Sequence, residues 1–272
     1  MPASQSSPQP PKATFIFKGT IRSLKQTTMP NVPVDDATVV VHVDQVLEAP
    51  RSLARLAGND ITVRLSKGPK VAPKQQFVFQ AAGWIFGRSV AVLSLSHDAV
   101  SATSAPAAGV ATDPVQRKRN RDLEGRVAEA DLVISGKVLV VRLPGSGLPA
   151  ASAPEPARPE SEHKPEWREA VVAVEKVHKG SGAATQVTLR FPNSKDVAWF
   201  RAPKFDVGQQ GYFILHKPTA EAAAAAPPAP RAPPAPAIGD IVYTALHPLD
   251  FQDYSQQLQL QTAISSSAPA AK

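Results

Sequence analysis

The chain has no cysteine among its 272 residues, which excludes a disulfide framework, a thiolate nucleophile and a cysteine-ligated zinc site. It also lacks an apolar run of the ~18 residues that a membrane-spanning helix requires. Its polar, proline-rich start has neither the basic end nor the apolar core of a signal peptide, although an exported protein shows a similar start after signal removal. We therefore expect no membrane span, and the cellular localisation stays open.

A strong charge of one sign is also missing. The 30 Lys and Arg residues outnumber the 23 Asp and Glu residues by a net charge of +7, which makes an acidic partner worth testing. The basic residues are spread along the chain, and only the short run RKRNR at residues 117–121 is concentrated. This is not the long single-sign block that is typical of a nucleic-acid-binding arm.

Proline is abundant and clustered, with 28 residues gathered mostly in a few Pro-, Ala- and Ser-rich stretches. Such composition offers too few apolar side chains to offset the entropy lost on ordering. We therefore predict disorder at both ends, in a linker and in two insertions: 1–12, 99–113, 143–165, 219–238 and 263–272.

Between these stretches lie short runs rich in Val, Ile, Phe and Thr, which are typical of β-strands. Each half of the chain has five of them: 14–22, 38–47, 60–65, 76–80 and 88–95, then 132–142, 170–178, 186–191, 211–215 and 240–246. The runs match in order, since VHVDQVLE at 41–48 corresponds to VAVEKVHK at 172–179 and ITVRL at 61–65 to VTLRF at 187–191. This repetition predicts two copies of one domain.

Two local features complete the prediction. Gly19 and Gly136 lie at corresponding places in the first strand of each copy, and glycine inside a strand indicates a bulge or tight bend. Residues 113–130 begin with Asp113 and Pro114, a cap and a first-turn residue, and are predicted to form a helix that leads into the second copy, with Leu123 and Val127 as its apolar stripe.

The predicted fold is all-β, with two five-stranded Greek-key barrels in tandem and one short helix before the second barrel. The first barrel is expected at 13–98 and the second at 114–262, interrupted by the two disordered insertions.

The second copy resembles the OB-type barrel of the netrin and tissue-inhibitor-of-metalloproteinase-like domains. The resemblance rests on an entry pattern A-D-x-V-x-x-G-x-V, a strand ending in Lys-Gly and a later Gly and Tyr: Ala130, Asp131, Val133, Gly136, Val138, Lys179, Gly180, Gly208 and Tyr212. It covers most of residues 130–215, and the first copy lacks the Lys-Gly pair. The resemblance implies the barrel alone, because the inhibitory chemistry of that family uses cysteines that this chain does not have.

No pattern in the sequence favours catalysis. There is no GxSxG or HExxH motif, and the six histidines have no metal-ligand spacing, so we expect surface or rim positions for all of them: His42, His97, His163, His178, His216 and His247. We expect no enzyme activity, no cofactor and no metal.

The candidate contact residues lie in two aromatic stretches. The first is the predicted hairpin tip with Trp84, Phe86 and Arg88, and the second is the loop AWFRAPKF, which contains Trp199, Phe200, Arg201, Lys204 and Phe205. Loops and exposed strand edges on two small barrels favour a binding or assembly module for a protein partner. The alternative is binding of single-stranded nucleic acid, since OB barrels stack bases on aromatic side chains beside basic ones. The sequence leaves the oligomeric state open.

Overall fold

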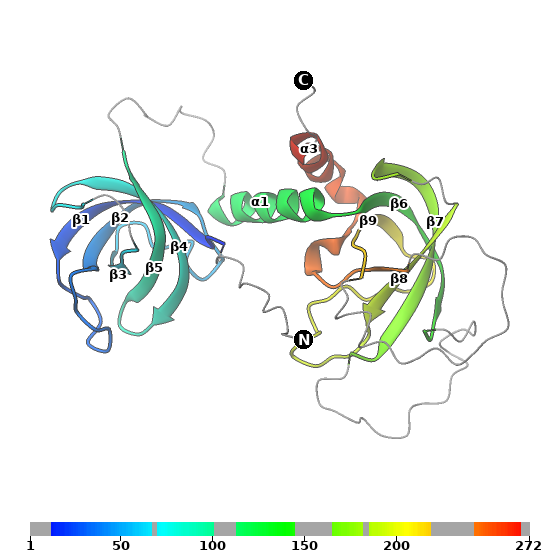
Figure 1. Cartoon of the computed structure of the whole chain (residues 1–272), viewed down its shortest axis with the longest axis horizontal. Coiled ribbons are helices and arrows are strands. Elements are labelled where there is room, and N and C mark those ends of the chain that lie inside the picture. Colours follow the sequence, from blue (N-terminus) through cyan, green and yellow to red (C-terminus); the bar gives the residue numbers. More distant parts are fainter. Residues whose placement is uncertain are drawn as a thin grey trace, which may run out of the picture. The chain divides into compact units, whose positions relative to one another are not determined.

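The computed structural model describes residues 12–66, 70–100, 113–144, 165–181, 185–218 and 242–267. The fold is mostly β and divides into two compact units, Met1–Arg121 and Asp122–Lys272 (Figure 1). Of the segments predicted to be disordered, 219–238 lies wholly outside the described residues. Of 1–12, 99–113 and 143–165, only the ends fall within them.

The first unit is a closed barrel with the strand order β1-β2-β3-β5-β4. Its five strands overlap the five predicted ones: β1 (Phe15–Leu24), β2 (Thr38–Glu48), β3 (Asp60–Arg64), β4 (Gln76–Phe86) and β5 (Val90–Ala99). The predicted ends of two strands are wrong, because β4 continues beyond 76–80 and β5 continues beyond 88–95. Alternate residues of β1 and β4 point inward, as period-two patterning requires, and fill the core with four buried phenylalanines. The rings of Phe15, Phe17 and Phe79 stack in sequence at centroid distances of 4.6 and 5.0 Å.

The second unit contains a six-stranded sheet in the order β10-β8-β7-β6-β9-β11. Five strands were predicted and the two-residue β11 was not: β6 (Leu132–Arg142), β7 (Trp167–Lys179), β8 (Gln186–Pro192), β9 (Gln210–Leu215), β10 (Val242–Thr244) and β11 (Phe251–Gln252).

Strand pairing follows one plan in both units. β1 lies between β2 and β4 as β6 lies between β7 and β9, and β3 runs parallel to β5 as β8 runs parallel to β10. The β1–β2 and β6–β7 registers also shift at three corresponding places: Ile16/Phe17, Lys18/Gly19 and Ile21/Ser23, and Val133/Ile134, Ser135/Gly136 and Val138/Val140. The repeated pattern in the sequence therefore corresponds to a repeated register in space.

Glycine is required at the second of these shifts. A Cβ on Gly19 would lie 2.6 Å from Val41 Cγ1 and 2.8 Å from the His42 carbonyl oxygen. A Cβ on Gly136 would meet the Ala173 carbonyl and lie 2.9 Å from Val172 Cγ1. The predicted bulge is confirmed at both positions, because only a residue without a side chain lets the neighbouring strand approach this closely.

The units differ most in their last strand. In the first unit β4 and β5 pair along almost their full length, from Phe77 with Ala99 to Phe86 with Val90. In the second unit β10 has three residues. A single isolated bridge joins its Thr244 to His216, the residue that follows β9.

The predicted helix is confirmed as α1 (Pro114–Glu129), and its Leu123 and Val127 are buried. The Val115 amide donates to Asp113 Oδ1 at 3.1 Å, so Asp113 caps the helix as its sequence position predicts. At the other end Lys179 Nζ donates to the Val127 and Ala128 carbonyls, a favourable place for a cation at a helix C-terminus.

The prediction of a single helix is wrong. After β10 the chain forms a 3-10 turn (Pro248–Asp250), β11, a second 3-10 turn (Tyr254–Gln256) and the helix α3 (Gln257–Ser267). Leu260 and Ala263 of α3 are buried in a cluster with α1 and Ile214. The helix therefore continues past residue 262, where the second domain was predicted to end, and the prediction of disorder at 263–272 is wrong for residues 263–267. The helical pattern was missed because α3 is short and polar, and its stability comes from this tertiary packing rather than from propensity.

Candidate functional site

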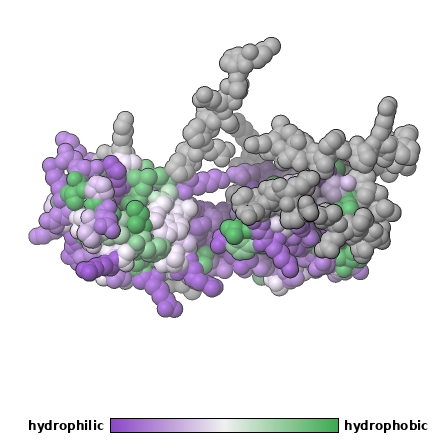
Figure 2. All heavy atoms as spheres, turned by 90° about the horizontal axis from the view of Figure 1, so that it is seen from below, coloured by the Kyte–Doolittle hydropathy of each residue, from purple (hydrophilic) through white to green (hydrophobic). Residues whose placement is uncertain are grey.

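The end of the β4–β5 hairpin carries the largest uninterrupted group of exposed apolar side chains in the first unit. Trp84, Ile85 and Phe86 follow one another and are 37%, 59% and 53% exposed. Hydrophobic atoms also gather at the surface of this unit in the space-filling view, where it is drawn on the left (Figure 2). Exposed apolar side chains that adjoin one another mark interaction surfaces more often than scattered ones do.

The three side chains point to both faces of the hairpin. Residues that are directly opposite in an antiparallel pair share a face. Trp84 lies opposite Val92 and Phe86 opposite Val90, so both aromatic rings continue the inward face of the barrel beyond its end. Ile85 lies on the outer face, the face that also carries Leu93, which is 45% exposed.

The same segment is an exposed strand edge. On one side β4 pairs with β5 to its last residue, but on the other it pairs with β1 only as far as Ala81. A register shift between Ala82 and Trp84 follows, at Gly83 with a φ of 65°, and within the described residues no strand covers this side of β4 beyond it. The bulge turns the end of β4 away from β1, which leaves the edge open.

The direction of the backbone groups follows from the turn. The Gly87 amide donates to the Ser89 carbonyl at 3.0 Å, so the polar groups of Gly87 face β5. Because these groups alternate along an antiparallel strand, those of Ile85 also face β5, while those of Trp84 and Phe86 face the open side.

The structure brings the predicted residues Trp84, Phe86 and Arg88 together on this hairpin, with Arg88 exposed in the turn. It adds Ile85 and Leu93, which were not predicted. Ile85 could have been found from alternation, because three consecutive apolar residues in a strand cannot all face one core.

The second predicted stretch lies in the loop between β8 and β9 and is only partly a surface. Phe200 is 55% exposed, and the Arg201 guanidinium lies 5.4 Å from its ring centroid in a cation–π contact. The Phe200 amide donates to the Asp196 carbonyl at 2.7 Å, which fixes the turn that presents the ring.

The other three predicted residues of this loop pack internally. Phe205 is 3% exposed and contacts the core ring of Phe213 at 5.6 Å, because the loop returns to the sheet at this point. Lys204 Nζ donates to the carbonyls of Pro192 and Trp199, and burial lowers the pKa of its amine. Trp199 is half-buried and its ring packs 5.7 Å from that of Trp167, which the sequence analysis did not single out. The structure therefore places Phe205 in the core and uses Lys204 to hold the loop together.

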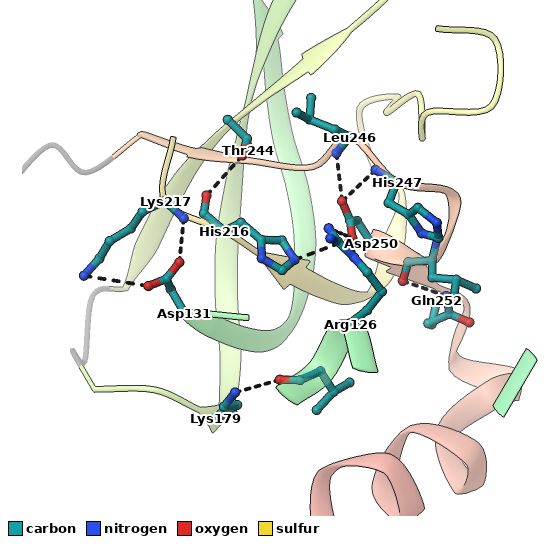
Figure 3. A network of polar contacts seen from close by, with 12 residues as sticks. Arg126, Asp131, Lys179, His216, Lys217, Thr244, Leu246, His247, Asp250 and Gln252 are labelled. Carbon is teal, nitrogen blue, oxygen red and sulfur yellow. Dashed lines mark hydrogen bonds and ion pairs between the residues drawn. The ribbon is translucent and has the colours of Figure 1, made fainter. Parts of the chain in front are cut away.

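A buried polar network lies where the C-terminal segment meets α1 and β9 (Figure 3). Asp250 is fully buried, and its Oδ1 accepts from Arg126 Nη2 at 2.6 Å and Nε at 3.0 Å. Its Oδ2 accepts from the Leu246 and His247 amides, both at 2.8 Å. His216 Nε2 lies 3.7 Å from Oδ1, beyond hydrogen-bond distance.

The Asp250 carboxylate is held in its charged form. Burial would raise its pKa, but the neighbouring His216 imidazole, the Arg126 guanidinium and the His247 amide outweigh burial, so the pKa lies below its ordinary value. Both oxygens are occupied by protein donors, so this carboxylate is suited to joining segments rather than to transferring protons.

The remaining histidines also have structural surroundings. His42 Nδ1 lies 2.6 Å from Asp60 Oδ1 on the surface of the first unit. The expected surface or rim position is wrong for His97, which is 2% exposed and packs near the core rings of Phe77 and Phe79. His178 Nε2 lies 3.2 Å from Ser135 Oγ, and burial and Lys176 lower its pKa. His163 lies outside the described residues. Across the described part of the chain, no group of three or more acidic or histidine side chains is placed to hold a metal ion.

No protein-family model matches the chain, and no match was found among curated proteins. In the part of the chain that the structure describes, neither α-helix is both long and apolar enough to cross a membrane.

Proposed function

We propose that this protein is a non-catalytic binding and assembly module whose β4–β5 hairpin recognises an extended segment of a protein. The observation that carries the proposal is the coincidence, at Trp84 to Phe86, of three exposed apolar side chains with an open strand edge. An extended partner segment added to such an edge gains main-chain hydrogen bonds, while its alternate side chains meet Trp84 and Phe86 on one face and Ile85 on the other.

The described residues of the second unit do not include a hairpin end of this kind. The position that corresponds to Ala82 is His216, which makes the isolated bridge to Thr244, and by Lys217 the chain has left the sheet. Among the described residues of the second unit, 122–144, 165–181, 185–218 and 242–267, no counterpart of the Trp84–Phe86 segment is present. An apolar segment that is exposed to water favours a role in binding.

The side chains are also of the type that dominates protein interfaces. Burying the remaining exposed surface of a large apolar side chain contributes about 25 cal/mol per Å², and Trp is among the residues whose truncation costs most affinity. The nearest charged residue along the chain is Arg88 in the turn, so little polar surface would have to be desolvated with the hairpin.

We further propose that both units are OB-type barrels, as their sequence order and the netrin-like resemblance of the second unit suggest. The strand order β1-β2-β3-β5-β4, the parallel β3–β5 pair and the matching β6–β10 registers support this assignment. In barrels of this kind the loop between the fourth and fifth strands is a usual binding element.

The absence of catalysis and of a cofactor also remains a proposal. It is supported by the internal pairing of the polar groups that could do chemistry. Asp250 accepts four protein donors, and Glu169 lies between Arg190 at 2.9 Å and Arg142 at 3.4 Å, in line across three strands.

The test is identification of the bound protein in the source organism, followed by binding to that purified protein. Trp84→Ala with Phe86→Ala should lower affinity at least ~100-fold, the loss of two central apolar contacts. The matched control is Val197→Ala with Val207→Ala, which removes exposed apolar side chains from the second unit and should leave binding unchanged. Equal losses in both variants, or none in the hairpin variant, would reject the proposal.

Single-stranded nucleic acid is the second candidate, favoured by the exposed Phe200 ring and its Arg201 partner. If it is right, a labelled oligothymidylate should bind at low salt, and affinity should fall steeply as salt rises. Phe200→Ala should weaken binding by a stacking contribution of about 1–3 kcal/mol. This single change is sharper than one at Trp199, because Trp199 packs on Trp167 and its loss would disturb the loop. No binding at low salt would eliminate this candidate.

A further inference from the structure

We propose that the extended segment recognised by the hairpin is the same segment of a second copy of this chain. Two β4 edges would pair antiparallel about a two-fold axis at Ile85, which joins two first-unit barrels into one continuous sheet. This inference rests on the proposed function and names the partner of that same site.

The open backbone groups fix the register. On the free side β4 presents the N–H and C=O groups of Trp84 and Phe86, while those of Ile85 face β5. Under two-fold symmetry, pairing Trp84 of each copy with Phe86 of the other satisfies all of these groups at once. A register centred on Trp84 or on Phe86 would leave half of them without a partner.

The side chains agree with this register. Trp84 would stand directly opposite Phe86 of the second copy, twice, on one face of the new sheet, and aromatic cross-strand pairs are favourable. On the other face Ile85 would meet Ile85 of the second copy. The exposed apolar side chains of both faces would thus be covered in a single step.

The charges permit self-pairing. Natural edge strands are usually protected from pairing by a Lys or another charge, yet residues 76–87 contain none. The first charge is Arg88, which would lie opposite Ala82 of the second copy rather than opposite another Arg88. The two guanidinium groups therefore fall at opposite ends of the paired segment.

Sedimentation of the full chain at moderate salt tests the association. We expect a reversible monomer–dimer equilibrium over protein concentrations from about 5 to about 500 µM. Ile85→Lys should abolish the dimer by placing two ammonium groups face to face. The control, Val207→Lys, adds a charge at an exposed valine of the second unit and should dimerise like the native chain.

Cross-linking tests the register, and the absence of native cysteine makes it specific. In the proposed pairing the two Ile85 residues form a non-hydrogen-bonded pair, whose Cα atoms lie roughly 4.5 Å apart, within the range that a disulfide spans. Ile85→Cys should therefore oxidise to a covalent dimer at least ~10-fold faster than Val34→Cys, an exposed position on another loop of the same unit.

Three results would overturn the inference. The native chain could remain monomeric at the highest concentration, Ile85→Cys could cross-link no faster than Val34→Cys, or deletion of residues 1–11 could convert a monomer into a dimer. The last would make the chain's own N-terminal segment the occupant. A monomer that still binds another protein through Trp84 and Phe86 would reject self-pairing alone, whereas loss of that binding too would reject the proposed function.

Discussion

The two units share a strand plan down to the position of each bulge, but they complete it by different means. The first closes with a ten-residue β5 paired along β4, and four stacked or tilted phenylalanines occupy its core. The second has only the three-residue β10 in that place, and the C-terminal segment with α3 and the Asp250 network lies against α1 and β9. One register can thus be stabilised either by strand pairing or by an added layer held by a buried ion pair.

This difference separates structure from function. What both units share belongs to the common strand plan, and the two glycines at the bulges are the clearest case. Whatever only one unit has must be explained separately, by packing for α3 and, we propose, by binding for the β4–β5 hairpin.

Among the changes that test the difference between the units, the largest effect is expected at the ion pair of the second unit. Arg126→Met leaves the fully buried Asp250 carboxylate without its main partner and should lower the free energy of unfolding by about 3 kcal/mol. Trp167 and Trp199 report this unit alone in a Trp84→Phe background, so urea unfolding followed by tryptophan fluorescence measures the loss. Asp206→Asn, at an exposed carboxylate, is the control, and an equal loss there would contradict the buried-pair explanation.

The shared bulges should respond alike. Gly19→Ala and Gly136→Ala each force a Cβ into the neighbouring strand and should cost about 1–3 kcal/mol in their own unit. Gly125→Ala in α1 meets no atom within 4 Å and should instead stabilise by about 0.5–1 kcal/mol. Calorimetry of the three variants measures these changes in stability. If Gly136→Ala were neutral while Gly19→Ala was destabilising, the two bulges would not be structurally equivalent.

Acid should weaken the second unit through Asp250. Its folded pKa lies below the ordinary value of 3.8, so its contribution is fully present above that value and is lost as pH falls through the lower folded pKa. Unfolding free energies of the Trp84→Phe chain between pH 7 and pH 3 should therefore decrease toward the acid end. In the Arg126→Met variant the decrease should be shallower, and parallel curves would show that the ion pair does not set this dependence.

The smallest effect is expected at the hairpin end. Ile85→Ala should change the stability of the first unit by about 1 kcal/mol or less, because the side chain is 59% exposed. Phe79→Ala, in the core of the same strand, should cost about 3–5 kcal/mol. Thermal unfolding measures both variants, and a large loss of stability in Ile85→Ala would show that the hairpin end has a structural role.

Local pattern was enough to place ten strands, α1 and the bulge glycines, because alternation, capping and close approach are properties of neighbouring residues. It also identified Trp84, Phe86 and Phe200 as exposed aromatic candidates. It could not separate Phe200 from Phe205, since one loop carries both and only its return to the sheet decides which ring is buried.

The sequence by itself determined the repeat, the strand order along the chain and the positions at which no side chain fits. The tertiary structure decided that β4 continues beyond its pairing with β1, and that Asp250 meets a guanidinium 124 residues away. The physical reason is that an open edge and a buried ion pair depend on which distant segments come together, whereas periodicity and capping depend only on residues within a few positions of each other.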